Sequence, residues 1–128
     1  VFDTSSLIAA AEHDYLSRFH RLLELHRVGI AKAVIQELDG MIKLREKRTA
    51  APAHGVPRLR QQEPEKLISR ALAVRNWITS THDRFPDQIV LQGSSDMDHV
   101  FLATATNNDD HILGYAVYLA KSQHRPVI

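Results

Sequence analysis

The residues best suited to chemistry in this chain are carboxylates at three separated places. Asp3 follows two apolar residues, Glu37 and Asp39 lie within a helical pattern, and Asp109 and Asp110 follow two asparagines. These places can converge at the carboxyl ends of parallel strands, where open α/β sheets bind their ligands. Clustered carboxylates repel one another unless a cation lies among them, and hard oxygen ligands suit Mg²⁺ or Mn²⁺. Such a site can activate a water and stabilise an in-line phosphoryl displacement.

The acids near the two ends of the chain also have structural explanations. Asp3 can hydrogen-bond within its own turn. Asn108 can cap a helix, and Asp109 and Asp110 would then stabilise the positive end of the helix dipole. The residue types alone leave both interpretations open.

The middle pair of acids is ambiguous in a different way. Glu37 and Asp39 lie near opposite edges of an apolar stripe with helical spacing. A carboxylate beside such a stripe is either an ion-pair partner at the rim or a site residue. Periodicity does not decide which of the two points inward.

The elements that must position these acids alternate along the chain. The first is an apolar strand within residues 1–8 that runs into a polar turn. The remaining pattern predicts a helix over Tyr15–Val28 that Gly29 ends, a strand at 28–31, a helix at 33–48, a loop at 49–63, a helix at 64–81 that begins near Pro64, a strand at 89–92, a helix after Asn108 and a strand starting at Pro126. No clear period is found at 99–106. The alternation is typical of a mostly parallel sheet covered on both faces by helices.

Length and composition limit the classes of protein that the chain can represent. Its 128 residues suit one domain. It has no cysteine, which excludes disulfides and thiolate metal sites, and no apolar run approaches the roughly 20 residues of a membrane span. Both ends fall inside expected strands, so we expect the sequence to be a piece of a longer protein.

The strongest local charge bias lies between residues 43 and 60. In this stretch the only acid is Glu46. The basic residues are Lys43, Arg45, Lys47, Arg48, Arg58 and Arg60. The stretch is either a solvated helix end with a loop or a surface that contacts the phosphate backbone of a nucleic acid.

Three segments together resemble the PIN domain nucleases. They are Val1-Phe-Asp-Thr-Ser-Ser-Leu-Ile8, Val34-Ile-Gln-Glu-Leu-Asp-Gly40 and Asn107-Asn-Asp-Asp-His-Ile-Leu113. The second is similar to the eukaryotic subgroup that acts in mRNA decay and mRNA quality control. The resemblance implies a single PIN-like nuclease domain over residues 1–128, built as a three-layer α/β/α sandwich. It also implies Mg²⁺- or Mn²⁺-dependent cleavage of single-stranded RNA.

The resemblance also assigns roles to individual residues. Asp3, Glu37 and Asp110 match the family's catalytic, metal-binding carboxylates, so the resemblance favours Glu37 over Asp39. Asp109 would be an auxiliary metal neighbour. Thr4 and Ser5 would support the site, with Ser5 standing where the family often has Asn. A further family Asp lies just past the strand that begins at Pro126, and this chain stops before it.

Two other functions compete with a nuclease. One is a degenerate PIN domain that keeps the fold as a scaffold for RNA-decay partners. The other is a response-regulator-like module with paired acids near Mg²⁺, but its phospho-acceptor Asp and its late Lys are not in place. We therefore expect an intracellular RNA endonuclease, cytoplasmic or nuclear, whose partners are single-stranded RNA and proteins bound through the parent protein, with no membrane partner.

Overall fold

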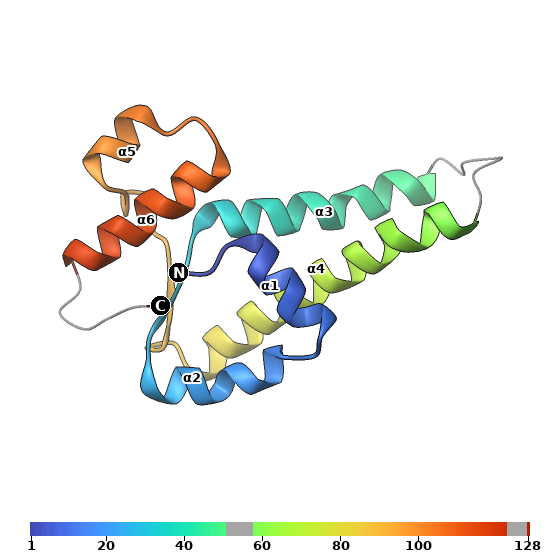
Figure 1. The fold of residues 1–128 in the computed structure, drawn as a ribbon, viewed down its shortest axis with the longest axis horizontal. Coiled ribbons are helices and arrows are strands. Elements are labelled where there is room, and N and C mark those ends of the chain that lie inside the picture. Colours follow the sequence, from blue (N-terminus) through green and yellow to red (C-terminus); the bar gives the residue numbers. More distant parts are fainter. Residues whose placement is uncertain (51–57, 123–127) are drawn as a thin grey trace.

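Helices surround a small parallel sheet in this chain (Figure 1). The structure, a computed structural model, describes the backbone of residues 1–50, 58–122 and 128 and the side chains of residues 1–44, 65–122 and 128. The strands are β1 (Val28–Ile30) and β2 (Ile89–Leu91). The helices are α1 (Thr4–Glu12), the 3₁₀ helix η1 (Leu16–Arg18), α2 (Phe19–Leu25), α3 (Lys32–Ala50), α4 (Arg58–Arg84), α5 (His99–Thr104) and α6 (Asn108–Ser122). Across these described ranges, no helix has the length and apolar character needed to cross a membrane.

The two strands confirm the parallel pairing expected from the sequence. Val28 lies opposite Ile89, and Ile30 lies opposite Leu91. Parallel strands need a long crossover connection, which α3 and α4 provide. All three residues of β1 are buried, as expected for a strand with helices on both faces.

The strand expected at the start of the chain is wrong. Residues 1–3 are not in a strand, and α1 begins at Thr4. The backbone position beside β1 is taken instead by Ile128. Its N–H donates to the carbonyl oxygen of Arg27 at 2.7 Å, and its carbonyl oxygen accepts from the N–H of Gly29 at 2.6 Å. A strand needs a neighbour, so its formation depends on contacts that a local pattern does not contain. Residues 126 and 127 lie outside the described residues.

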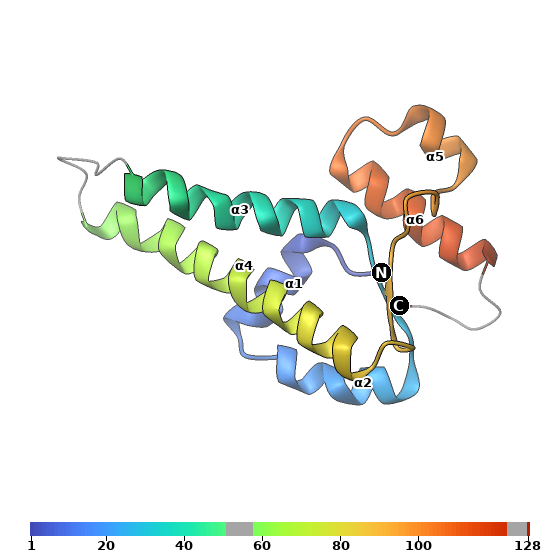
Figure 2. The same cartoon turned by 180° about the vertical axis from the view of Figure 1, so that it is seen from behind.

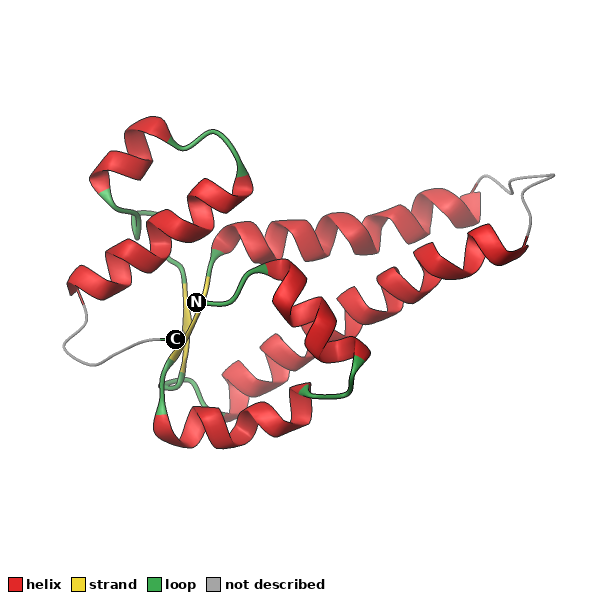
Figure 3. Ribbon diagram, in the orientation of Figure 1, coloured by secondary structure: helices red, strands yellow, loops and turns green. Residues whose placement is uncertain are grey.

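Helices lie on both sides of the sheet (Figure 3). On one side, the buried Tyr115 of α6 donates from its hydroxyl to the carbonyl oxygen of Val90 at 3.0 Å. Gly29 lies within β1 and does not end the preceding helix, which stops at Leu25. A Cβ at Gly29 would meet Cδ1 of Leu119 at 2.6 Å, so glycine permits the close approach of α6. The fold is α/β, but the sheet in the described residues has two strands. This sheet is smaller than the central sheet that we expected for a three-layer sandwich.

Helices α3 and α4 form a long antiparallel hairpin that projects away from the sheet (Figure 2). The predicted loop at residues 49–63 is wrong at both ends, because α3 continues to Ala50 and α4 begins at Arg58. Pro64, expected in a first helical turn, is the seventh residue of α4. Packing of the two helices against each other outweighs the local breaking signals. Residues 51–57 lie outside the described part.

Candidate functional site

Asp3 is the N-cap of α1. Its Oδ1 accepts a hydrogen bond from the Ser6 N–H at 2.7 Å. The Ser6 hydroxyl and then this N–H lower the pKa of Asp3, so its exposed carboxylate is charged at neutral pH. The structural role expected for Asp3, a hydrogen bond within its own turn, is therefore carried out by Oδ1. It leaves Oδ2 free of that cap bond, so capping and metal binding are compatible roles for the same side chain.

Asp110 is held in the same way at the start of α6. Its Oδ2 accepts from the backbone N–H of Thr106 at 3.1 Å and from the Thr106 hydroxyl at 3.2 Å. The backbone bond and then the hydroxyl lower the pKa of Asp110. The predicted cap Asn108 is wrong by one position, because the side chain of Asn107 accepts from the N–H of Asp110 at 2.9 Å. This reciprocal pattern resembles a capping box. Asp109 lies beside it in the first turn and is exposed.

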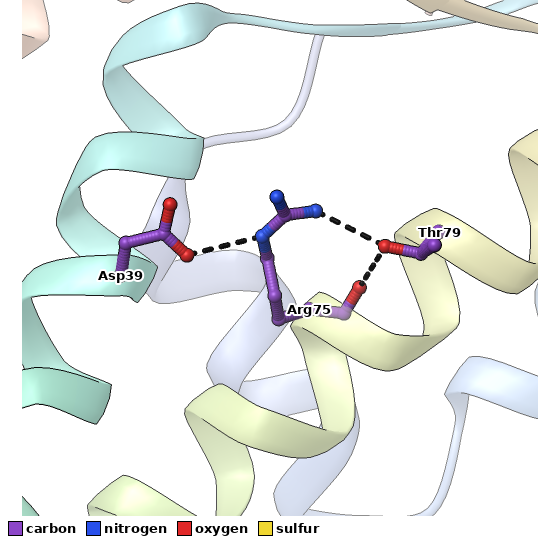
Figure 4. Close-up of polar contacts among 3 residues, drawn as sticks. All are labelled: Asp39, Arg75 and Thr79. Atoms are coloured by element: carbon purple, nitrogen blue, oxygen red, sulfur yellow. Dashed lines mark hydrogen bonds and ion pairs between the residues drawn. The ribbon is translucent and has the colours of Figure 1, made fainter.

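The structure separates Glu37 from Asp39, which periodicity left undecided. Asp39 accepts from Nε of Arg75 on α4 at 3.1 Å. This bond bridges α3 and α4, and Arg75 also donates to the Thr79 hydroxyl on its own helix at 3.1 Å (Figure 4). Asp39 is thus an interhelical ion-pair partner. Glu37, two residues earlier, lines a pocket on the α1 side of α3.

That pocket has a volume of about 240 Å³ and lies between α1, α3 and α4. Thr4 and Ser5 line it together with Glu37. Thr4 is 4% exposed, and its Oγ1 is buried with no hydrogen-bond partner. A buried polar atom without a partner is unusual in a folded protein, so this hydroxyl has hydrogen-bonding capacity that the described residues do not use.

The three helices that carry the acids begin near one end of the sheet. Both α1 and α6 pack against α3, and all three begin near the end of β1 (Figures 1 and 2). Among the residues that the structure describes, however, no three Asp, Glu or His side chains are grouped closely enough to hold a metal ion. The structure thus brings Glu37 together with Thr4 and Ser5 and places Asp3 and Asp110 at the starts of the two helices that pack against α3, without a closed metal cluster among the described residues.

The basic stretch is only partly visible. Lys43 lies on α3 and is exposed. The other members of the stretch have backbones at the adjoining ends of the hairpin helices, while their side chains lie outside the described residues; they are Arg45, Lys47, Arg48, Arg58 and Arg60. Their contact with RNA therefore stays a prediction.

Sequence reasoning missed the residues that orient the acids. Ser6 and Thr106 hold the carboxylates of Asp3 and Asp110, and Arg75 holds Asp39. A local signal existed for Ser6, which is three residues after an N-cap acid, the spacing at which a cap accepts a backbone bond. No local signal existed for Arg75, which is 36 residues from its partner.

Comparison with known proteins identifies the family. A family model described as the PIN domain matches residues 1–128. The chain therefore belongs to the PIN domain family. PIN domains are in general nucleases, and they typically use divalent metal ions such as Mg²⁺. Searches of curated proteins and of solved structures found no match to the chain.

Proposed function

We propose that this chain is a metal-dependent endoribonuclease domain that cleaves single-stranded RNA in mRNA decay or quality control, in the cytoplasm or the nucleus. The observation that carries the proposal is the pair of helix-end carboxylates, Asp3 and Asp110. Hydrogen bonds from neighbouring residues lower the pKa of each, so both are charged at neutral pH. They flank the helix that presents Glu37 to the pocket containing Thr4 and Ser5.

The donor atoms of this site suit a hard divalent cation. Carboxylate oxygens and the unpartnered hydroxyl of Thr4 are ligands for Mg²⁺ or Mn²⁺. Asp3, Glu37 and Asp110 would hold the ion, with Asp109 as an auxiliary neighbour. Since Mg²⁺ keeps several of its waters, a looser arrangement than a closed cluster can serve. The bound ion supplies an activated water and charge stabilisation at the phosphate.

The chain's own residues would then place the substrate. Lys43 and the other basic residues of the hairpin would bind phosphates of the strand without regard to sequence. Ser6 and Thr106 lower the pKa of Asp3 and Asp110 and fix the orientation of their carboxylates. Partner proteins would bind through the parent protein.

A cleavage assay tests this proposal. Asp110→Asn keeps the size of the side chain and an oxygen that can accept from Thr106, but it removes the charge. We expect unstructured RNA to be cut in Mn²⁺ by a form extended beyond Ile128, and poorly or not at all by residues 1–128 assayed alone. We expect Asp110→Asn or a chelator to abolish cleavage while circular dichroism shows a retained fold. Equal cleavage by the unaltered extended form and by its Asp110→Asn variant would refute the proposal.

One observation favours a second function. The described residues contain no group of three acids close enough for a metal, as expected for a degenerate domain that serves as a scaffold for RNA-decay partners. Absence of cleavage by the extended form in Mn²⁺, with RNA or partner binding intact, would select this alternative.

A further inference from the structure

The pocket beside Glu37 extends beyond the groups that the proposed cleavage uses. Its other lining residues are mainly apolar and come from three helices; they are Ile8, Ala9 and Glu12 of α1, Met41 of α3 and Leu67 of α4. Ser5, Ile8, Ala9 and Glu12 follow one another at helical spacing, so they share one face of α1. Met41 is one turn beyond Glu37 on α3. The pocket therefore has a polar end at Ser5 and Glu37 and an apolar wall that leads to Glu12.

Glu12 is a fixed acceptor at the far end of this wall. Its Oε1 lies 3.2 Å from Nη2 of Arg70 on α4, and its side chain remains 45% exposed. Glu12 is seven positions after Ser5, which corresponds to about 10 Å along a helix.

The two carboxylates and the apolar wall of the pocket determine which part of a nucleotide fits there. Glu12 and Glu37 would repel a phosphate, whereas an apolar wall accepts the face of a planar ring. Met41 adds a polarizable thioether that adapts to aromatic rings. Single-stranded RNA presents unstacked bases whose edges can be read by hydrogen bonds, and a carboxylate accepts from an exocyclic amino group. Uracil has no amino group, and the one donor on this edge, its N3–H, lies between two carbonyl oxygens that face a carboxylate unfavourably.

We propose that this pocket binds one base of the RNA strand and that Glu12 selects bases with an exocyclic amino group, namely cytosine, adenine and guanine, over uracil. The proposal rests on the proposed RNA-cleaving function and adds a specificity residue to it. Glu12 reads the base edge, and Arg70 orients Glu12.

Binding without cleavage tests this proposal. The chain has two methionines, Met41 and Met97. Met97 is not among the residues that line the pocket, and it packs against α6 at Gly114. We would label both with ¹³C-methyl groups and titrate short oligocytidine, oligoadenylate and oligouridine in the presence of a chelator. We expect oligocytidine and oligoadenylate to shift the Met41 signal at concentrations at least about fivefold lower than oligouridine does. The Met97 signal serves as the reference.

Three variants separate base reading from a structural effect. Glu12→Gln should bring the three titrations within about twofold of one another. Arg70→Gln breaks the same surface pair and removes the residue that orients Glu12 but keeps the acceptor, so the preference should persist at a reduced size. Glu24→Gln, on the exposed face of α2, should change nothing. A Met41 signal that does not move, or that moves equally with uridine, would overturn the inference. The measurement needs no cleavage, so failure of the nuclease proposal would appear separately, as inactive protein in Mn²⁺.

Discussion

Asp3 is expected to carry two separable roles, an N-cap for α1 and a ligand for the metal. Asp3→Asn keeps an oxygen for the Ser6 N–H and removes the charge, while Asp3→Ala removes both. Asn and Asp cap helices about equally well, whereas replacing either with Ala costs about 1 kcal/mol. We therefore expect both variants to lose metal-dependent cleavage and the Ala variant alone to lose appreciable stability.

The expected change in melting temperature follows from the chain length. An unfolding entropy of about 2.1 cal/mol/K per residue over 128 residues gives about 0.27 kcal/mol/K. A loss of about 1 kcal/mol in Asp3→Ala then lowers Tm by about 4 °C. Asp3→Asn should stay within about 2 °C of the unaltered chain at neutral pH.

The pH dependence gives a second measurement on the same residue. Ser6 lowers the pKa of Asp3 in the folded chain. The charged cap therefore contributes stability above the unfolded pKa of about 3.9, and this contribution is lost as pH falls through the lower folded pKa. The stability advantage of the unaltered chain over Asp3→Asn should thus be larger at pH 7 than at pH 3. Circular dichroism melts and a gel assay of unstructured RNA in Mn²⁺ check these points. Normal cleavage by Asp3→Asn would show that Asp3 is a cap and nothing more.

Two further predictions concern the hairpin and the packing of α6. Replacing three basic residues of α3 with Ala should weaken binding of every RNA sequence; these residues are Arg45, Lys47 and Arg48. The dependence of the binding constant on salt concentration should also become shallower, by about 0.7 per lost phosphate contact on single strands. Fluorescence anisotropy at several salt concentrations measures this, and an altered sequence preference with an unchanged slope would contradict it. Gly114→Ala should lower Tm by about 4–11 °C, because its Cβ would meet Met97 and would lie 2.7 Å from Cβ of Phe101, and overpacking costs about 1–3 kcal/mol. Gly40→Ala is the matched control: no atom lies within 4 Å of its Cβ, so Tm should rise or hold, and an equal fall in both variants would show that packing is not the cause.

Elements with their own hydrophobic period were predictable from sequence. The expected strands at 28–31 and 89–92 correspond to β1 and β2, and the helix expected at 33–48 corresponds to α3. The period was hidden in α5, which has six residues and exposes both Val100 and Leu102. The start of α6 was misplaced by one residue, because two adjacent asparagines are equally good caps by type.

Features that depend on distant partners were not predictable. Residues 1–3 have the apolar character of a strand, but Ile128 occupies the hydrogen-bonding position beside β1. The candidate site had the same difficulty. The stripe on α3 narrowed the choice to Glu37 and Asp39, and the residue that distinguishes them, Arg75, lies on another helix. The family resemblance, rather than periodicity, favoured Glu37.

The Asp39–Arg75 pair adds a polar restraint on how α3 is rotated about its own axis, beside the packing of Val34 and Leu38 in the core. Residues 37 and 39 are about 200° apart around a helix, so fixing Asp39 against α4 fixes the direction of Glu37 on the opposite side. A side-chain tip lies about 5–6 Å from the helix axis, so a rotation of about 10° moves it by roughly 1 Å. Displacements of this size can cost about a hundredfold in rate when a catalytic group is misplaced. A half-exposed ion pair that adds little to stability can therefore act as an alignment device for chemistry on the far side of its helix.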